Sequence, residues 1–416
     1  MDAKRAFSLL RKIGFTRTGG SGEELRAAEI LLEEIASAGG EGVLEEFPVN
    51  TQTITAQKLF ADKAEYEAAA YGHSGSTPKE GLTAPFYYME YFTDNEVAKI
   101  DAKGKIVLTN GYMGLKTYKA LADAGCVGFI TFGGDVLDKK SNSDLMPREL
   151  RQQLKDYKVL PGMNMRAPDA MRLVKQKPKN ITFVIEQEET TTASRNVIAE
   201  IKGELDEIVV LTAHYDSVPF SKGVYDNGSG SVLLTELFRH FMRFKPRRTL
   251  RFVWCGSEER GLLGSKAYVK AHQSELDKFI FCINVDVGGP VLGIERASIT
   301  AEEKLTHAVD YMAKELGHSM QVKTDIYSSD SIPFADKGIP AINFSRDGAK
   351  GCDHIHDRND TMFYLSADAL KSTGEFLEKF ADRYINSYAF PVARKIPDDI
   401  RKKIDEYLNP LKEDKK

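Results

Sequence analysis

Residues that can bind a metal ion follow three short apolar runs in the second half of the chain. The runs 207–213, 250–255 and 279–285 are rich in β-branched and aromatic residues, which predicts buried strands. In an α/β sheet, ligands bind beyond the carboxyl ends of the strands. We therefore expect the residues just after the runs to meet in one crevice. They are His214 and Asp216 after the first run, Glu258 and Glu259 after the second, and Asp286 after the third.

Two further segments add side chains of the same kind. The segment 223–230 contains Asp226, and the segment 352–361 contains His354 and His356. A crevice with so many carboxylates would carry costly unpaired negative charge unless cations fill it. Imidazole and carboxylate without thiolate suit zinc, with manganese or cobalt also compatible. More ligands are present than the three that one catalytic zinc uses, which favours two metals that share a carboxylate and activate a bridging water.

The candidate ligands lie within a set of six sequence blocks. The blocks are His-Tyr-Asp-Ser at 214–217, Asp-Asn-Gly-Ser-Gly at 226–230, Ser-Glu-Glu-Arg-Gly-Leu-Leu-Gly-Ser at 257–265, Asn-Val-Asp at 284–286, Ser-Asp-Ser-Ile-Pro-Phe with Lys-Gly-Ile-Pro within 329–340, and His356 through Thr361. Together they resemble the co-catalytic di-zinc aminopeptidase family of zinc metallopeptidases, and they occur in the family's order. The resemblance implies a zinc-dependent exopeptidase with two Zn²⁺ per chain. It would hydrolyse the N-terminal bond of a peptide or small amide through a metal-bridged hydroxide.

The resemblance also implies a role for each ligand. One carboxylate would bridge the two metals, and two further residues would complete each site. The implied ligands are His214 and Asp286 for one zinc, Glu259 and His356 for the other, and Asp226 as the bridge.

Two more acidic residues would act without binding metal. Glu258 would be the general base that takes a proton from the water and passes it to the leaving amine. Asp216 would accept a hydrogen bond from the second ring nitrogen of His214 and fix its tautomer. The peptide bond after the bridging aspartate is often cis in the family, and Asp226-Asn227 occupies that place.

The sequence near His356 leaves open which histidine binds metal and which residue donates a hydrogen bond to the oxyanion. His354 lies two residues before His356 and could bind in its place, although the spacing to the following Asp-Thr pair favours His356. Some family members have a tyrosine directly before this histidine that donates to the oxyanion, but this chain has Ile355. The hydroxyl of Tyr225 or Tyr327 is a candidate donor instead.

Alternating strands and helices must position these residues. A capping box at Ser21 and Glu24 predicts a helix over 22–38. From Asn196 onward, short strands alternate with helical stretches. The pattern predicts an α/β fold with a mixed, mostly parallel sheet sandwiched by helices, as in zinc aminopeptidases.

A change of pattern after the first strand predicts a second domain. Gly104-Lys-Ile-Val-Leu and the segment 122–130 resemble the protease-associated domain, which implies that 59–183 is an inserted smaller α/β domain. The catalytic domain would then comprise 1–58 and 184–392, and 393–416 would be a C-terminal tail with a short helix. We expect the inserted domain to supply no metal ligand.

Composition excludes several classes of protein. Lys and Arg number 57 against 61 Asp and Glu, and a net charge of −4 argues against nucleic-acid binding. The four cysteines form no CxxC pair, and no apolar run is long enough to span a membrane. Residues 1–15 lack a secretory signal, which predicts a cytoplasmic protein, although a trimmed secreted protein would read the same. The sequence indicates no oligomeric state.

Three other functions compete with aminopeptidase activity. A glutaminyl-cyclase-like transferase would use one zinc ion. A carboxypeptidase acting on acidic dipeptides would need basic residues near the site, for which Arg346 and Arg358 are candidates. A non-enzymatic receptor-like relative would have lost ligands, and no ligand position is missing here.

Overall fold

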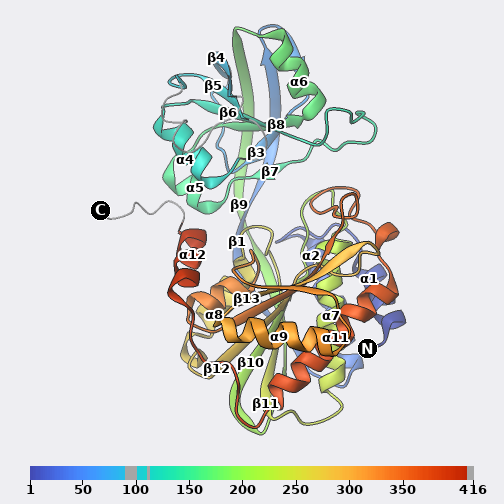
Figure 1. Ribbon diagram of the computed structural model, residues 1–416. Coiled ribbons are helices and arrows are strands. Elements are labelled where there is room, and N and C mark those ends of the chain that lie inside the picture. Colours follow the sequence, from blue (N-terminus) through green and yellow to red (C-terminus); the bar gives the residue numbers. More distant parts are fainter. Residues whose placement is uncertain (90–100, 110–112, 410–416) are drawn as a thin grey trace. The chain divides into compact units, whose positions relative to one another are not determined.

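The chain forms two compact units, which a computed structural model describes for residues 1–89, 101–109 and 113–409 (Figure 1). Unit 1 consists of Met1–Val49 and Thr192–Leu408, and Asn50–Thr191 belong to unit 2. The boundaries expected from the sequence, at 58/59 and 183/184, differ from these. They fall inside two long strands, β1 (Gly42–Ala61) and β9 (Asn180–Ile201), where backbone pairing continues although the sequence pattern changes.

Unit 1 contains a mixed, mostly parallel sheet, as the sequence predicted. The order of its strands is β14-β13-β15-β12-β10-β11-β9. β10 pairs in parallel with β11 and β12, and β12 pairs in parallel with β15, whereas β9 and β13 add antiparallel pairs. The strands are β10 Leu205–His214, β11 Arg248–Cys255, β12 Phe279–Val285, β13 Gly293–Thr300, β14 Met320–Thr324 and β15 Ala341–Gly348.

Helices cover both faces of this sheet. Val209 and Leu211 of β10 belong to the core that includes α1, α7 and α11, whereas Val210 packs with α8 and α10. Successive side chains of a strand point to opposite faces, so these cores lie on opposite sides. The helices are α1 Ala3–Ile13, α2 Gly22–Ser37, α7 Ser229–Phe241, α8 Leu263–Ala271, α9 Glu303–Glu315, α10 Ser331–Asp336 and α11 Ala367–Ile385, with the short turns η2 Gln273–Glu275 and η3 Met362–Tyr364.

Residues 393–408 are part of the folded chain, whereas 410–416 of the expected C-terminal tail lie outside the described residues. Helix α12 (Asp398–Leu408) buries Ile400 and Ile404 against Ile332 of α10. These contacts make 393–408 part of unit 1 rather than a separate tail. The sequence predicted the helix but gave no sign of its packing partner.

Unit 2 is a smaller α/β unit with its own cores. It contains a βαβ arrangement, because β5 and β6 pair in parallel and α4 lies between them in sequence. Its identity as a protease-associated domain stays a prediction. The elements are β2 Ala64–Tyr66, β3 Ala69–Gly72, β4 Leu82–Met89, β5 Ile106–Thr109, β6 Gly128–Gly133, β7 Arg148–Glu149, β8 Gly162–Arg166, α4 Leu115–Asp123, α5 Gln152–Tyr157 and α6 Ala167–Gln176.

Within the described ranges, no helix has both the length and the apolar character needed to cross a bilayer.

Candidate metal centre

All five predicted metal ligands meet in unit 1. The carboxyl ends of three neighbouring strands supply three of them, and two loops supply the others. His214 ends β10, Glu259 follows β11, Asp286 follows β12, Asp226 comes from the turn η1 (Val224–Gly228), and His356 comes from the loop after β15. No group of this kind occurs in unit 2 among the residues that the structure describes.

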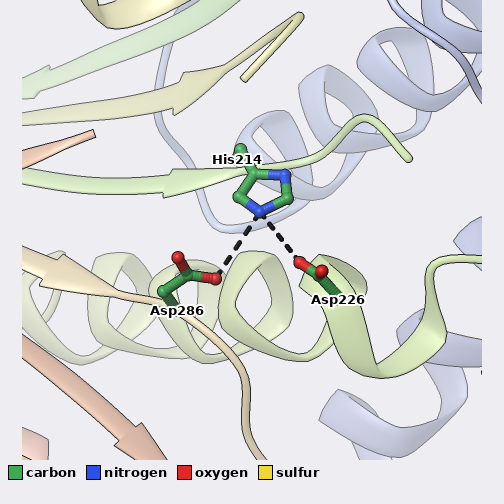
Figure 2. A group of neighbouring side chains, drawn as sticks. All are labelled: His214, Asp226 and Asp286. Atoms are coloured by element: carbon green, nitrogen blue, oxygen red, sulfur yellow. Dashed lines mark ion pairs between the residues drawn. The ribbon is translucent and has the colours of Figure 1, made fainter. Parts of the chain in front are cut away.

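The first group consists of His214, Asp226 and Asp286. Figure 2 shows the imidazole of His214 with its Nε2 facing both carboxylates. Nε2 lies 3.1 Å from Asp226 Oδ1 and 3.5 Å from Asp286 Oδ1. All three residues are buried, and their potential ligand atoms lie within 4.8 Å of one another. The spacing suits one shared cation.

The second group consists of Asp226, Glu259 and His356. His356 Nε2 lies 3.0 Å from Asp226 Oδ2 and 3.0 Å from Glu259 Oε2. Asp226 therefore faces the two groups with different oxygens, Oδ1 toward His214 and Oδ2 toward His356. A carboxylate in this position can bridge two cations.

The donor set fits two zinc-type cations. Imidazole nitrogens and carboxylate oxygens are ligands that zinc accepts. Glu259 Oε1 is buried and has no hydrogen-bond partner, which leaves a polar atom unsatisfied unless a cation or water meets it. Cys255 and Cys282 are buried within strands, whereas Cys352 is half-buried and belongs to neither ligand group.

Protons occupy this cluster when it holds no metal. Burial raises the pKa of Glu259 to about 7, and the charge of Asp226 adds to the shift. Burial would also raise the pKa of Asp226, but hydrogen bonds from the two histidines outweigh it and lower that pKa. Burial opposes the charge of His356, yet the Glu259 and Asp226 carboxylates raise its pKa to about 12. A divalent cation would displace such protons.

Asp216 lies beside the first group and is fully buried. Its Oδ1 lies 3.4 Å from Nδ1 of His214, on the ring side opposite the ligand atom. Its carboxylate also accepts hydrogen bonds from the backbone N–H groups of Glu258 at 2.9 Å and Glu259 at 3.2 Å. Asp216 therefore contacts the first histidine and the glutamate turn at once, and the second contact has no signal in the sequence.

Asp360 supports the turn that carries Asp226. Its oxygens accept hydrogen bonds from the backbone N–H groups of Tyr225 at 2.7 Å and Asp226 at 3.1 Å, and from the Ser221 hydroxyl at 3.2 Å. The peptide bond Asp226-Asn227 is cis, as the resemblance implied.

The structure distinguishes His356 from His354 and shows which groups the Tyr225 hydroxyl contacts. His354 belongs to neither group, because its Nδ1 faces Asp357 Oδ2 at 3.1 Å. The Tyr225 hydroxyl donates to the carbonyl of Arg346 at 2.9 Å and accepts from the N–H of Gly348 at 2.9 Å. Tyr225 is thus engaged with the backbone rather than with the cluster.

Two buried residues of the amino-terminal segment were missed by sequence reasoning. Arg17 donates to the backbone carbonyls of Tyr215, Lys222 and Gly223, which lie between His214 and Asp226 in the chain. Glu24 contacts the turn before Glu258. In the sequence Glu24 reads as a helix cap, and Arg17 lies in a polar stretch with no pattern.

The sequence is similar to those of known peptidases. The model of the family described as Peptidase family M28 matches residues 196–381. Aminopeptidase YwaD of Bacillus subtilis is 31% identical over 327 residues, which are 73% of this chain and 68% of that protein. Carboxypeptidase Q of Mus musculus is 27% identical over 233 residues, 52% of this chain and about half (49%) of that protein.

Solved structures show the same fold. The structure of BSAP, a zinc aminopeptidase from Bacillus subtilis, has a TM-score of 0.76 and 24% identity, and the match covers 96% of this chain and 98% of that one. A peptidase M28 precursor from Shewanella amazonensis has a TM-score of 0.72 and 25% identity, with 95% of this chain and 98% of that one covered. Both neighbours match across nearly the whole chain.

Proposed function

The chain belongs to peptidase family M28, and from that premise we propose that it is a zinc aminopeptidase that uses two metal ions to remove N-terminal residues from peptides. The observation that carries the proposal is the position of Asp226, whose two oxygens face two separate histidines. A peptide substrate follows from membership of a peptidase family. The number of metal ions and the aminopeptidase specificity are the parts that need testing.

The residues present would hold the ions as two sites with one common ligand. His214 and Asp286 would hold one, Glu259 and His356 the other, and Asp226 both. Zinc bound there would activate a water molecule and polarise the carbonyl of the scissile bond. The burial of His214, Asp226 and Asp286 strengthens such electrostatic effects at the first site.

Glu258 is the group best placed to move the proton. Its Oε2 lies 3.9 Å from His214 Nε2, and it belongs to neither ligand group. Burial raises the pKa of Glu258 well above its ordinary value, with Glu259 adding to the shift. A carboxylate of raised pKa accepts a proton from water more readily and can return it to the leaving amine.

The hydroxyl of Tyr327 is a better candidate than that of Tyr225 to donate a hydrogen bond to the oxyanion formed in the reaction. Among the described residues no hydrogen bond of the Tyr327 hydroxyl is found, whereas Tyr225 is bound to the backbone. Burial raises the pKa of Tyr327, and the charges of Asp286, Asp347 and Asp226 add to the shift. The hydroxyl would remain a donor at neutral pH.

The two main alternatives have less support. A transferase with one zinc would not need the second group of Asp226, Glu259 and His356. A carboxypeptidase for acidic dipeptides would need a basic side chain that is free to bind the substrate. Of the two candidates, Arg346 and Arg358, the first is bound to Glu295 at 3.1 Å and to the carbonyl of Pro290 at 2.8 Å.

Zinc analysis and a substrate panel test the proposal together. The purified protein would be analysed for zinc per chain and assayed with aminoacyl chromogenic amides, N-acetylated versions of the same amides, and acidic dipeptides. We expect two zinc ions per chain and hydrolysis only of amides with a free amino group. One tightly bound zinc without amide hydrolysis would overturn the proposal, and preference for acidic dipeptides would favour the carboxypeptidase.

A further inference from the structure

A residue of helix α2 holds the turn that carries the two site glutamates. Glu24, in the first turn of α2, is fully buried. Its Oε1 accepts hydrogen bonds from the backbone N–H of Ser257 at 3.0 Å and from the hydroxyls of Ser194 at 2.7 Å and Ser257 at 3.3 Å. Its Oε2 accepts one from the N–H of Gly20 at 2.7 Å. Glu24 thus joins the start of α2 to the turn after β11.

Two carboxylates share the backbone of this turn. Glu24 accepts from the N–H of Ser257, and Asp216 accepts from the next two N–H groups, those of Glu258 and Glu259. Ser257 has a φ of 51°, in the left-handed region that a residue with a side chain rarely adopts. Because the backbone does not favour this conformation by itself, the hydrogen bonds to Glu24 and Asp216 stabilise it.

The amino-terminal segment also packs tightly against the same turn. A Cβ added to Gly19 would lie 2.2 Å from Ser257 Oγ, and one added to Gly256 would lie 2.8 Å from Glu24 Oε1. The Arg260 guanidinium donates to the carbonyl of Gly19 at 3.1 Å. The turn therefore has little room to shift while these contacts persist.

We propose that Glu24 is a positioning residue of the metal centre. Together with Asp216 it fixes the turn so that Glu259 faces His356 while Glu258 stays outside both ligand groups. This inference rests on the proposed function, because it gives those two glutamates different tasks. Without Glu24, the N–H of Ser257 is left unpaired in a buried place and the turn relaxes. A displacement of about 1 Å at a catalytic group can cost roughly 100-fold in rate.

The test compares Glu24→Gln with Glu23→Gln. Gln keeps the size of the side chain but has only one acceptor oxygen for the four donors around Glu24, and its NH2 group would face one of them. The fold therefore persists while the link between the Gly20 segment and the turn weakens. Glu23 is the exposed neighbour in the same helical turn and is the matched control. For each variant, circular dichroism and thermal unfolding check the fold, zinc titration of the metal-free protein gives two affinities, and kinetics give kcat and KM.

For Glu24→Gln we expect a folded protein whose kcat is lower by about 10- to 100-fold with little change in KM. Its affinity for one zinc ion should fall by a similar factor, while its affinity for the other stays that of the wild type. The control should match the wild type throughout. A general loss of stability would lower both zinc affinities together, so the selective loss distinguishes positioning from mere support of the fold.

Two results would overturn the inference. One is a folded Glu24→Gln variant with wild-type kcat and both zinc affinities intact, and the other is an equal loss at both sites. If the wild type binds two zinc ions but hydrolyses no aminoacyl amide, the proposed function fails, and the zinc titration alone decides the role of Glu24. A wild type that binds fewer than two zinc ions overturns both proposals.

Discussion

The backbone N–H of Asp226 donates a hydrogen bond to Oδ2 of Asp360 at 3.1 Å. The N–H of the preceding Tyr225 donates to the other oxygen of the same carboxylate at 2.7 Å. Asp226 is the only residue that belongs to both ligand groups found among the described residues. The orientation of both groups therefore depends on a residue that is in neither of them.

Asp360→Asn should weaken both metal sites together. The amide would present a donor to one of two backbone N–H groups, so the turn at Asp226 would move. We expect a loss of about 10- to 100-fold in metal affinity or activity. Zinc titration and kcat measure the effect, with the exposed Asp353→Asn as control. Unchanged affinities would show that the turn is held without Asp360.

Removal of the shared ligand should differ from removal of an unshared one. Asp226→Ala takes away one oxygen from each group, so both zinc affinities should fall. His214→Ala affects only the first group directly, so one zinc ion should remain bound. Zinc per chain after dialysis against a fixed free zinc concentration measures both. Equal metal loss in the two variants would argue against a bridging Asp226.

The two adjacent glutamates should respond differently to the same substitution. Glu258→Gln should keep two zinc ions while kcat falls by about 10²- to 10⁴-fold, the usual contribution of a general base. Glu259→Gln should lose one zinc ion, because Glu259 faces His356 at 3.0 Å. Zinc stoichiometry and kcat on both variants separate the roles. Metal loss in Glu258→Gln with full occupancy in Glu259→Gln would reverse the assignment.

Zinc binding should release protons and weaken as the pH falls. In the metal-free protein Glu259 and Asp226 raise the pKa of His356 to about 12, against the effect of burial, so its ring is protonated at neutral pH. Zinc must displace that proton, so affinity should increase with pH. Calorimetry in buffers of different ionisation enthalpy counts the protons. His356→Ala should release fewer, and equal release would contradict the assignment.

Arg17→Met should destabilise unit 1. The fully buried guanidinium donates to carbonyls that include those of Ile13 at 2.9 Å, Lys222 at 2.7 Å and Gly223 at 2.6 Å. Methionine would remove these charge-assisted hydrogen bonds, at a cost of about 3 kcal/mol or more in the free energy of unfolding. The carbonyls of Ile13 and Gly223 would each keep one backbone donor, the N–H of Phe15 and of Gly228. Urea unfolding without metal measures the shift, with the exposed Arg11→Met as control. A shift no larger than that of the control would contradict this account.

The elements that position the site were largely predictable. The strands ending at His214 and Val285 are apolar runs with polar residues directly behind them, and the structure has both strands where the pattern places them. Strands β13 and β14 were not anticipated, because they mix polar and apolar residues and are recognised only by their partners. The domain boundaries expected at 58/59 and 183/184 and the limits of the two compact units at Val49 and Thr192 all fall inside β1 and β9, where no break in the strands marks a boundary.

The sequence by itself determined the fold class, the family resemblance and the types of ligand, because the order and spacing of polar residues after apolar runs are local properties. Only the tertiary structure decided that His356 rather than His354 joins the cluster, and that Asp226 turns one oxygen toward each histidine. Contacts such as Glu24 with Ser257 join residues 233 positions apart. They depend on how helices pack on the sheet, and no local pattern encodes that distance.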